Sequence, residues 1–488
     1  MPAGERDGGD PEPDRSSGRT VLGRRPTRRR VLRTLLLLAL AVGLTLAPYA
    51  LVSAASLPGS SAGPDRIAEP ACTNPTAATA DGPVLNATVE RVAGTQRVRV
   101  TYDAGALAAA GETFSVSTAG ARTTVLDATG FRADGHTYTW TGDPAPSITY
   151  RYAVTNGSGG VLDASAQFAA GEDWALAPIP AVSHAPVEYS VRPDGLVPRD
   201  EFRGGIAYVG SLSAVERAVG CQEVTIHYPG DVQRGTATAI GEAIAVTSEA
   251  YPLGHRSEAV TVLVTPLHTG VGGYTVGDFM TVNPSGTASP ATIATHEYVH
   301  TRQRNSYAPR LRWLTEAVPS YYMYRLQAET GRISTAEYVV QLYAFDDRAE
   351  WNRQFSATTT PNHYYRGAVT LAALDQRIRE ATGGERTLLD VIRRLNAIDG
   401  TVTLPAFEET VSAVAGESLS GWVDRHVVAG EPVTLTAPAA DFLPAQGWVV
   451  LGTYDLLLST FPPVALVFVL MWYTVLGAVT AVIGRLRR

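Results

Sequence analysis

The chain has 488 residues, of which 45% are hydrophobic and 18% charged, so it can form several folded domains and is not a disordered chain. Its 40 basic residues are all arginine, which excludes Schiff-base and phosphate-loop chemistry that depends on lysine. The net charge of −7 combines two basic ends with an acidic body, and an acidic body argues against a nucleic-acid partner.

Both ends of the chain carry signals for a membrane. Residues 1–33 are predicted to be a disordered, basic cytoplasmic tail, and residues 34–55 form an apolar run that is either a signal peptide or a transmembrane anchor. Residues 464–484 lack charge and predict a transmembrane helix, and residues 485–488 form a basic cytoplasmic end. Positive charge outside both segments predicts a body outside the cytoplasm that is held at the lipid bilayer.

The first part of the body is predicted to be all-β. After a linker at residues 56–82, residues 83–172 show short alternating runs separated by turns, which predict a β-sandwich domain. A proline-rich connector is expected at 173–204. The clearest strand signals are Gln96–Ala104, Thr113–Gly120 and His136–Gly142. Cys72 and Cys221 are the only cysteines, and outside the cell they could form one disulfide, although both could equally be free and buried.

The pattern changes at residue 205, where strand signals are followed by helical ones. Strands followed by helices predict an α+β domain at 205–432, ahead of a juxtamembrane linker at 433–463. A helix is expected across Thr236–Tyr251, and the chain reads almost entirely as helix from Asn305 to about 430. The expected strands are Ile206–Gly210, Glu223–Tyr228, Ala259–Leu267 and a short edge strand at Phe279–Asn283.

One helix of this domain carries the pattern HExxH. Ser289 is a suitable N-cap and Pro290 suits the first helical position. His296 and His300 lie four residues apart, so a helix presents both imidazoles on one face, where they can bind zinc. Glu297 would lie beside the metal and act as the general base toward the water that zinc activates.

Glu316 is the predicted third zinc ligand. It follows His300 after a distance that allows a turn and a return on a second helix. Thr315 is expected to cap that helix and Pro319 to fall in its first turn, where a missing N–H is harmless. An acidic residue in a first turn is also common for electrostatic reasons alone, so the spacing by itself leaves both interpretations open.

The segment WLTEAVPSYY around Glu316 resembles the WLxEGxxxYY segment of gluzincin metallopeptidases, whose zinc is held by the two histidines of HExxH and a distant glutamate. The similarity is strongest to the glycyl-aminopeptidase-like branch, which has a thermolysin-like catalytic domain. It continues through HYYRGAVTLAALDQRIREATGGERTLLDVIRRL at His363–Leu395 and the helical segment at Phe407–Glu431, so it covers about 205–432. That family also places a β domain ahead of the catalytic unit.

The resemblance implies roles for further residues. Tyr365 would correspond to the family's tyrosine that donates a hydrogen bond to the oxyanion, Tyr321 to an aromatic in packing or behind the ligands, and Arg366 to a lysine. Ala317 replaces a glycine. The GxxEN-type motif that related aminopeptidases use to bind the substrate's free amine has no convincing match, because Gly272–Tyr274 offers no acid.

The remaining histidines are individually weaker candidates. His255, His268 and His363 are read as surface or loop residues, although His363 could line the cleft because it neighbours Tyr365.

The sequence therefore predicts a membrane-anchored, extracytoplasmic zinc metallopeptidase with Zn²⁺ as cofactor and a peptide or protein substrate. An extended peptide is expected to add to the edge strand near Phe279–Asn283. The alternative is a catalytically inactive, zinc-containing surface protein that binds a partner through its β-sandwich domain. A membrane-embedded protease is a weaker alternative, because HExxH lies in a polar region. Exo or endo specificity and the oligomeric state stay open.

Overall fold

The structure, a computed structural model, describes the body of the chain. The predicted basic tail, both apolar segments, the basic C-terminal end and nearly all of the two linkers lie outside the described residues. Within the described residues, no helix combines the length and apolar character needed to cross a bilayer. The described residues are 72, 83–92, 96–118, 123–153, 169–171, 173–197, 205–254, 256–265, 272–286, 288–303 and 305–436.

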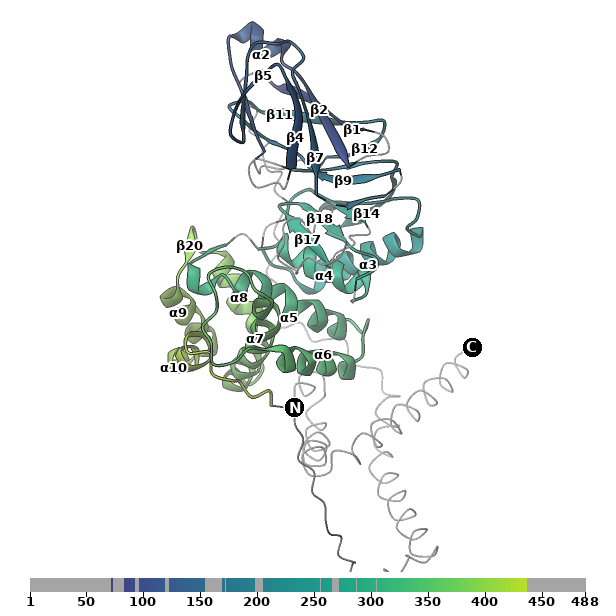
Figure 1. Cartoon of the computed structure of the whole chain (residues 1–488). Helices are drawn as coiled ribbons and strands as arrows, with labels where there is room; N and C mark the ends of the chain where they lie inside the picture. Colours follow the sequence, from purple (N-terminus) through teal and green to yellow (C-terminus); the bar gives the residue numbers. More distant parts are fainter. Residues whose placement is uncertain are drawn as a thin grey trace, which may run out of the picture. The chain divides into compact units, whose positions relative to one another are not determined.

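The N-terminal domain contains two sheets that share one hydrophobic core (Figure 1). Alternation builds this core: in β2, Val98, Val100 and Tyr102 are fully buried, while Arg97 before them and Arg99 between them are exposed. The five-stranded sheet has the order β11-β1-β2-β7-β4, with β1 Leu85–Val92, β2 Arg97–Asp103, β4 Thr123–Thr129, β7 Ser147–Tyr152 and β11 Val187–Arg192. The four-stranded sheet has the order β10-β3-β6-β5, with β3 Ser115–Ser117, β5 Phe131–Asp134, β6 Thr137–Trp140 and β10 Ala181–Ser183. A short helix, α2, spans Gly105–Ala110.

The stretch 173–204 is not the expected connector. It supplies β10 and β11 to the two sheets, and β9 and β12 to a third sheet of order β12-β13-β9-β8. Its described prolines misled the prediction because they fall at or between strand ends, where a missing N–H costs no ladder bond; Pro178, for example, is the last residue of β9. This third sheet contains β8 Ala169–Ala170, β9 Ala175–Pro178, β12 Gly195–Leu196 and β13 Ile206–Val209, so the strand expected at the start of the α+β domain pairs with the connector instead.

The α+β domain begins with a five-stranded sheet of order β14-β15-β16-β18-β17. Its strands are β14 Ser213–Val219, β15 Gln222–Tyr228, β16 Ala259–Val264, β17 Gly273–Val276 and β18 Phe279–Val282. The central strands β15, β16 and β18 are parallel, and β14 and β17 close the two edges antiparallel. Two helices, α3 Arg234–Ala250 and α4 Pro290–His300, pack against this sheet through a shared core (Figure 1).

One strand assignment was wrong in its position. The segment Phe279–Asn283 was expected to be an edge strand, but β18 pairs with β16 on one side and with β17 on the other. The edge beside α4 is therefore β17, which sequence reading did not identify as a strand because Gly272 and Gly273 stand at its start and glycine is depleted in strands. A peptide cannot add to β18, since both of its sides are already paired.

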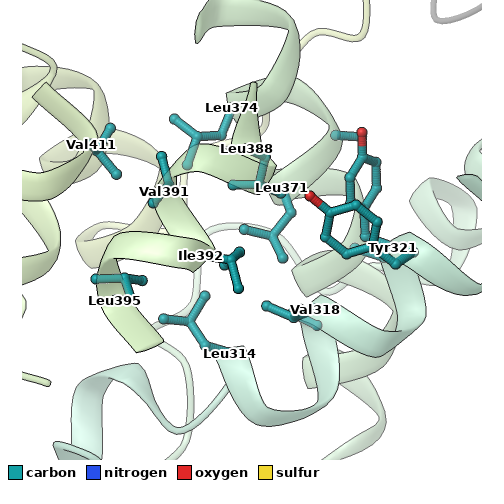
Figure 2. Close-up of a cluster of buried hydrophobic side chains, with 14 of the residues drawn as sticks. Leu314, Val318, Tyr321, Leu371, Leu374, Leu388, Val391, Ile392, Leu395 and Val411 are labelled. Atoms are coloured by element: carbon teal, nitrogen blue, oxygen red, sulfur yellow. The ribbon is translucent and has the colours of Figure 1, made fainter. Parts of the chain in front are cut away.

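The C-terminal part is helical, as predicted, and packs around one core (Figure 2). Leu314 and Val318 of one helix meet Leu371 of a second and Ile392 of a third in this core. Each such fully buried aliphatic side chain contributes about 1.5–3 kcal/mol. The helices are α5 Leu314–Glu329, α6 Thr335–Arg348, α7 Pro361–Thr382, α8 Leu388–Asn396, α9 Leu404–Ala415 and α10 Ser420–Val423, with a 3₁₀ turn η2 at Pro309–Leu311, a π-helical turn η3 at Asp424–Val428, and the paired two-residue strands β19 Ser306–Tyr307 and β20 Thr401–Val402.

The start of α5 differs from its prediction. Trp313, not Thr315, is the residue before the helix, so Pro319 is the sixth helical residue and lies beyond the first turn. Proline at that position removes the bond that its N–H would make to the carbonyl of Thr315. The burial of Trp313 and Leu314, both 0% exposed, offsets this local cost by anchoring the helix start in the core.

The two cysteines form a disulfide. Cys72 and Cys221 are joined with Cα atoms 5.7 Å apart, which settles the alternative that the sequence left open. Cys221 lies in the turn between β14 and β15, so the bond ties the chain ahead of the β domain to the first hairpin of the α+β domain.

Candidate metal and catalytic site

Helix α4 presents the HExxH residues as the sequence predicts. The side chain of Ser289 accepts a hydrogen bond from the backbone N–H of Thr292 at 3.1 Å, so the predicted N-cap is confirmed. His296 and His300 lie one turn apart, with their Nε2 atoms 3.2 Å from each other. His296 and Glu297 are 8% and 4% exposed, so these two residues of the motif are buried and do not lie on the surface.

Helix α5 returns Glu316 to the two imidazoles. Its Oε2 atom lies 3.6 Å from Nε2 of His296 and 3.3 Å from Nε2 of His300. In the part of the chain that the structure describes, these three residues are the group whose ligand atoms gather closely enough to hold a metal ion, all within 4.8 Å of one another. The structure thus brings together the three residues that the sequence nominated.

The spacing of these atoms fits a zinc ion. Three ligands of a tetrahedral zinc with bonds of about 2.0–2.2 Å are separated from one another by roughly 3.3 Å. The three separations here, 3.2, 3.6 and 3.3 Å, lie close to that value. Two imidazole nitrogens and one carboxylate oxygen are also the donor set that catalytic zinc sites use, and three protein ligands leave the fourth position open.

Electrostatics ties the three groups together. Burial opposes protonation of His300, but the adjacent Glu316 carboxylate, together with Glu297 and Gln303, outweighs burial and raises the pKa of that imidazole to about 8. Burial likewise opposes ionisation of Glu316, and the two imidazoles outweigh it and hold the pKa of that carboxyl far below its usual range. In the metal-free protein, a proton therefore partly neutralises the negative charge that a cation would otherwise balance.

Gln303 is a site residue that the sequence did not nominate. Its Oε1 atom lies 3.1 Å from Nδ1 of His300, and its Nε2 donates to the main-chain oxygen of Leu314 at 3.3 Å. Gln303 therefore fixes the His300 ring with Nε2 directed at the cluster, and it also links α4 to the start of α5. The sequence feature that could have identified Gln303 is a side chain with an acceptor atom three residues after the second histidine of HExxH.

Glu297 is held by strand β17. The hydroxyl of Thr275 donates to Oε2 of Glu297 at 2.7 Å and also lies 3.0 Å from the main-chain oxygen of the same residue. Gly273, two residues earlier, leaves the space into which the carboxylate reaches, since a Cβ there would lie 2.9 Å from Oε1. Burial raises the pKa of Glu297, while the two imidazoles and Thr275 partly offset this effect.

The tyrosine that faces the cluster is Tyr364, and the nomination of Tyr365 was wrong. The ring of Tyr364 stacks on His296 with centroids 6.0 Å apart and planes 12° apart. Tyr365 instead packs against Phe345 at 5.5 Å and under the guanidinium of Arg348. Successive residues of a helix point about 100° apart, so only one of two adjacent tyrosines on α7 can face the ligands.

A close crossing of α5 and α7 brings Tyr364 to the cluster. A Cβ at Gly367 would lie 2.6 Å from Cβ of Ala317, so α7 can approach α5 here only because it carries glycine. The alanine that departs from the family pattern on α5 is thus accommodated by the glycine opposite it. Tyr364 lies three residues before Gly367 on α7, about one helical turn, and Glu316 lies one residue before Ala317 on α5. The crossing at Gly367 and Ala317 therefore brings Tyr364 and Glu316 close together.

Other nominated residues lie elsewhere. The hydroxyl of Tyr321 donates to Oδ2 of the buried Asp375 at 2.8 Å, so this residue serves the packing of α5 on α7 and does not contact the metal cluster. His255 and His268 lie outside the described residues.

Arg366 and His363 lie behind the cluster, under the loop that precedes α7. Nη1 of Arg366 donates to the main-chain oxygens of Glu350 and Arg353, and its guanidinium lies 3.5 Å from the ring centroid of Phe355. His363 is fully buried beside Phe355, and burial lowers the pKa of its imidazole. These two residues pack against the loop that precedes α7 and do not bind the metal cluster.

No protein-family model matches the sequence, and no curated protein matches it. Among solved structures, the fold is similar to that of an aminopeptidase N family protein from Idiomarina loihiensis, with a TM-score of 0.53, 12% identity, and coverage of 74% of this chain and 78% of that chain. An M1 zinc metallopeptidase from Deinococcus radiodurans matches with a TM-score of 0.44 and 16% identity over 72% of this chain and 93% of that chain. The chain therefore shares the mixed α+β fold of an aminopeptidase N family protein.

Proposed function

We propose that this chain is a membrane-anchored, extracytoplasmic zinc metallopeptidase of the gluzincin type, in its glycyl-aminopeptidase-like branch. The observation that carries the proposal is the return of Glu316 on α5 to the two imidazoles of α4, with Glu297 beside them. The fold that the chain shares with an aminopeptidase N family protein is consistent with this activity.

His296, His300 and Glu316 would hold Zn²⁺. When bound, the ion acts as a Lewis acid toward water and toward the carbonyl oxygen of the scissile amide. Their atoms have the donor types and the spacing for this ion, and Gln303 keeps the His300 ring in the orientation that binding requires.

Glu297 is the proposed general base. Its carboxylate takes a proton from the attacking water, and as the amide C–N bond breaks it passes that proton to the leaving nitrogen. Burial raises the pKa of this carboxyl, which brings it toward the range in which one group can accept and then return a proton near neutral pH.

Tyr364, in place of Tyr365, is the proposed oxyanion donor. Burial, together with the nearby Glu316 carboxylate, raises the pKa of its hydroxyl well above the usual value, so the hydroxyl keeps its proton. A protonated phenol beside the ligands can donate a hydrogen bond to the carbonyl oxygen as negative charge develops there.

An extended peptide is proposed to add to β17, the edge strand beside Glu297. Backbone pairing would place the scissile bond along the edge next to α4. A peptide whose backbone amides are N-methylated on both sides of the cleavage point should then show a KM raised at least tenfold. Equal KM values for the methylated and plain peptides would remove β17 from the binding surface.

The proposed location is outside the cytoplasm, at the membrane. The disulfide between Cys72 and Cys221 supports it, since such bonds persist in oxidising compartments. The proposal rests otherwise on the two apolar segments and their basic flanks. A C-terminal epitope tag should be reached by antibody only after the cells are permeabilised, whereas the body should be accessible on intact cells.

The deciding experiment uses the full chain purified in detergent and a peptide library with free and blocked N-termini, before and after chelation. Glu297→Gln should keep zinc and lose about 10²–10⁴-fold in activity, because a general base contributes that factor. Equal activity of this variant would exclude the enzyme and favour the zinc-containing surface protein instead. The library's preference for free or blocked termini decides between exo- and endopeptidase action.

A further inference from the structure

We propose that Thr275 on β17 is a positioning residue, which holds the Glu297 carboxylate in its proton-accepting orientation through one hydroxyl. The inference rests on the proposed peptidase function for its catalytic meaning, and on the geometry of β17 and α4 for its structural part.

The first observation is the hydrogen bond itself. Thr275 Oγ1 lies 2.7 Å from Oε2 of Glu297, within the usual range for a hydroxyl that donates to a charged oxygen. The same hydroxyl lies 3.0 Å from the main-chain oxygen of Glu297. One side chain of the edge strand thus contacts both the carboxylate and the backbone of the residue that follows the first histidine.

The second observation is Gly273, on the same face of the strand two residues earlier. A Cβ at this position would lie 2.2 Å from the main-chain oxygen of Thr281 on β18, and 2.9 Å from both Cγ and Oε1 of Glu297. The face of β17 that meets α4 therefore has two parts: a hydroxyl that engages Oε2, and a position without a side chain beside Oε1. With Oε2 engaged, Oε1 is the oxygen that takes the proton.

Catalysis depends on this arrangement because a glutamate carboxylate rotates easily. Its last torsion has a broad, two-fold profile, so packing alone fixes the oxygens poorly. A hydrogen bond to one oxygen fixes the plane of the group, and small displacements of a catalytic group cost large factors in rate. Loss of the Thr275 hydroxyl should therefore lower kcat and leave KM nearly unchanged, because the hydroxyl does not bind the peptide.

The kinetic test compares Thr275→Val with Thr275→Ser. Valine keeps the branched shape without the hydroxyl, and we expect kcat to fall about 10- to 100-fold, the factor for a hydrogen bond to a charged group. Serine restores the hydroxyl and should recover most of the rate. Zinc content is measured in both variants and should not change.

Thr281→Val is the matched control. The Thr281 hydroxyl also anchors β17, since it accepts a bond from the backbone N–H of Tyr274 at 3.1 Å, whereas the hydroxyl that bonds to the Glu297 carboxylate is that of Thr275. If Thr281→Val lowers kcat as much as Thr275→Val, then Thr275 acts by holding the strand, and the inference is overturned. A fall in kcat that serine does not restore would overturn it as well.

A second readout does not depend on activity. In crystal structures of the metal-free protein, Glu297 should leave its position in Thr275→Val and keep it in Thr275→Ser. An unmoved carboxylate in Thr275→Val would refute the positioning role, whatever the kinetics show. If the zinc-loaded wild type cleaves no peptide, the proposed function fails, and these crystal structures still decide whether Thr275 positions Glu297.

Discussion

Helix α4 carries buried polar side chains on two faces, and the two faces differ in the partners that these polar atoms meet. Behind the helix, Tyr298 and Arg302 both bond to Oε1 of Gln222 on β15, at 2.5 and 3.0 Å, and Arg302 also bonds to Ser248 on α3 at 3.0 Å. Donors there meet acceptors within the protein. This back-face network holds α4 against the sheet and α3 through hydrogen bonds within the protein.

The front face is arranged differently. The Nε2 atoms of His296 and His300 and Oε2 of Glu316 converge on one another, and each carries a lone pair in the form that binds a metal. Three acceptors at such distances repel unless a proton or a cation lies between them. The comparison teaches that burial and polarity alone do not identify a site; convergence of acceptors does.

The largest effect is expected on the front face. Tyr364→Phe should lower kcat about 10²- to 10³-fold, the usual result of removing one oxyanion donor. Tyr365→Phe is the matched control on the next residue of α7, and its rate should change little because its ring packs against Phe345. Steady-state kinetics with one peptide measures both variants. The reverse order would restore the original nomination of Tyr365.

On the back face, the expected effect is on stability. Arg302→Met should lower the free energy of unfolding by about 3 kcal/mol, because Gln222, Ser248 and Tyr298 would be left buried without their shared partner. Urea denaturation measures the loss, and Arg310→Met, at an exposed arginine, is the control. A variant as stable as wild type would show that the back face is not a structural network.

Gln303 follows α4, and its Oε1 atom lies 3.1 Å from Nδ1 of His300 on the front face. Gln303→Leu should weaken zinc binding about 10- to 100-fold, as loss of a partner behind a metal ligand usually does. Competition with a chromophoric chelator measures the affinity, and Gln354→Leu, at an exposed glutamine, is the control. Unchanged affinity would mean that helix packing alone orients the His300 ring.

Some of the site residues could be predicted from the sequence and others could not. The HExxH pattern placed two imidazoles on one face because helical periodicity is local, and the structure brings Glu316 to them as nominated. Tyr364 and Tyr365 show the limit: the resemblance was read one residue out of register, and a shift of one residue turns a helical side chain by about 100°. Thr275 was missed because strand pairing across the β17–β18 turn is not encoded in spacing.

The fold, like the site, was predicted where the signal is local in the sequence. Alternating hydrophobic and polar residues predict strands such as β2 and β15, and apolar faces predict the helices beyond residue 305. The connector at 173–204 was misread because whether a proline-rich stretch pairs depends on partners far away, as in the parallel pairing of β11 with β1. Whether β18 is an edge strand likewise depends on β17, a strand of four residues.

The smallest predicted effect concerns His363, a buried imidazole whose pKa is lowered. Burial lowers the pKa of both His300 and His363, and Glu316 raises both. For His300 the adjacent Glu316, with Glu297 and Gln303, outweighs burial and raises the pKa to about 8, whereas for His363 burial outweighs the opposing effects of the Ser356 backbone and Glu316, and the pKa is lowered. Below about pH 6.5 the unfolded chain protonates His363 and the folded chain resists, so this residue should destabilise the protein as the pH falls.

His363→Phe removes that contribution and keeps a ring beside Phe355. Between pH 7.5 and 5.5 the free energy of unfolding of the variant should fall less than that of wild type, by on the order of 1 kcal/mol. Urea titrations at the two pH values measure the difference, and the comparison of slopes is independent of any constant loss from the substitution. Equal pH dependence would mean that His363 takes up its proton in the folded state, because the Ser356 backbone and Glu316 then outweigh burial.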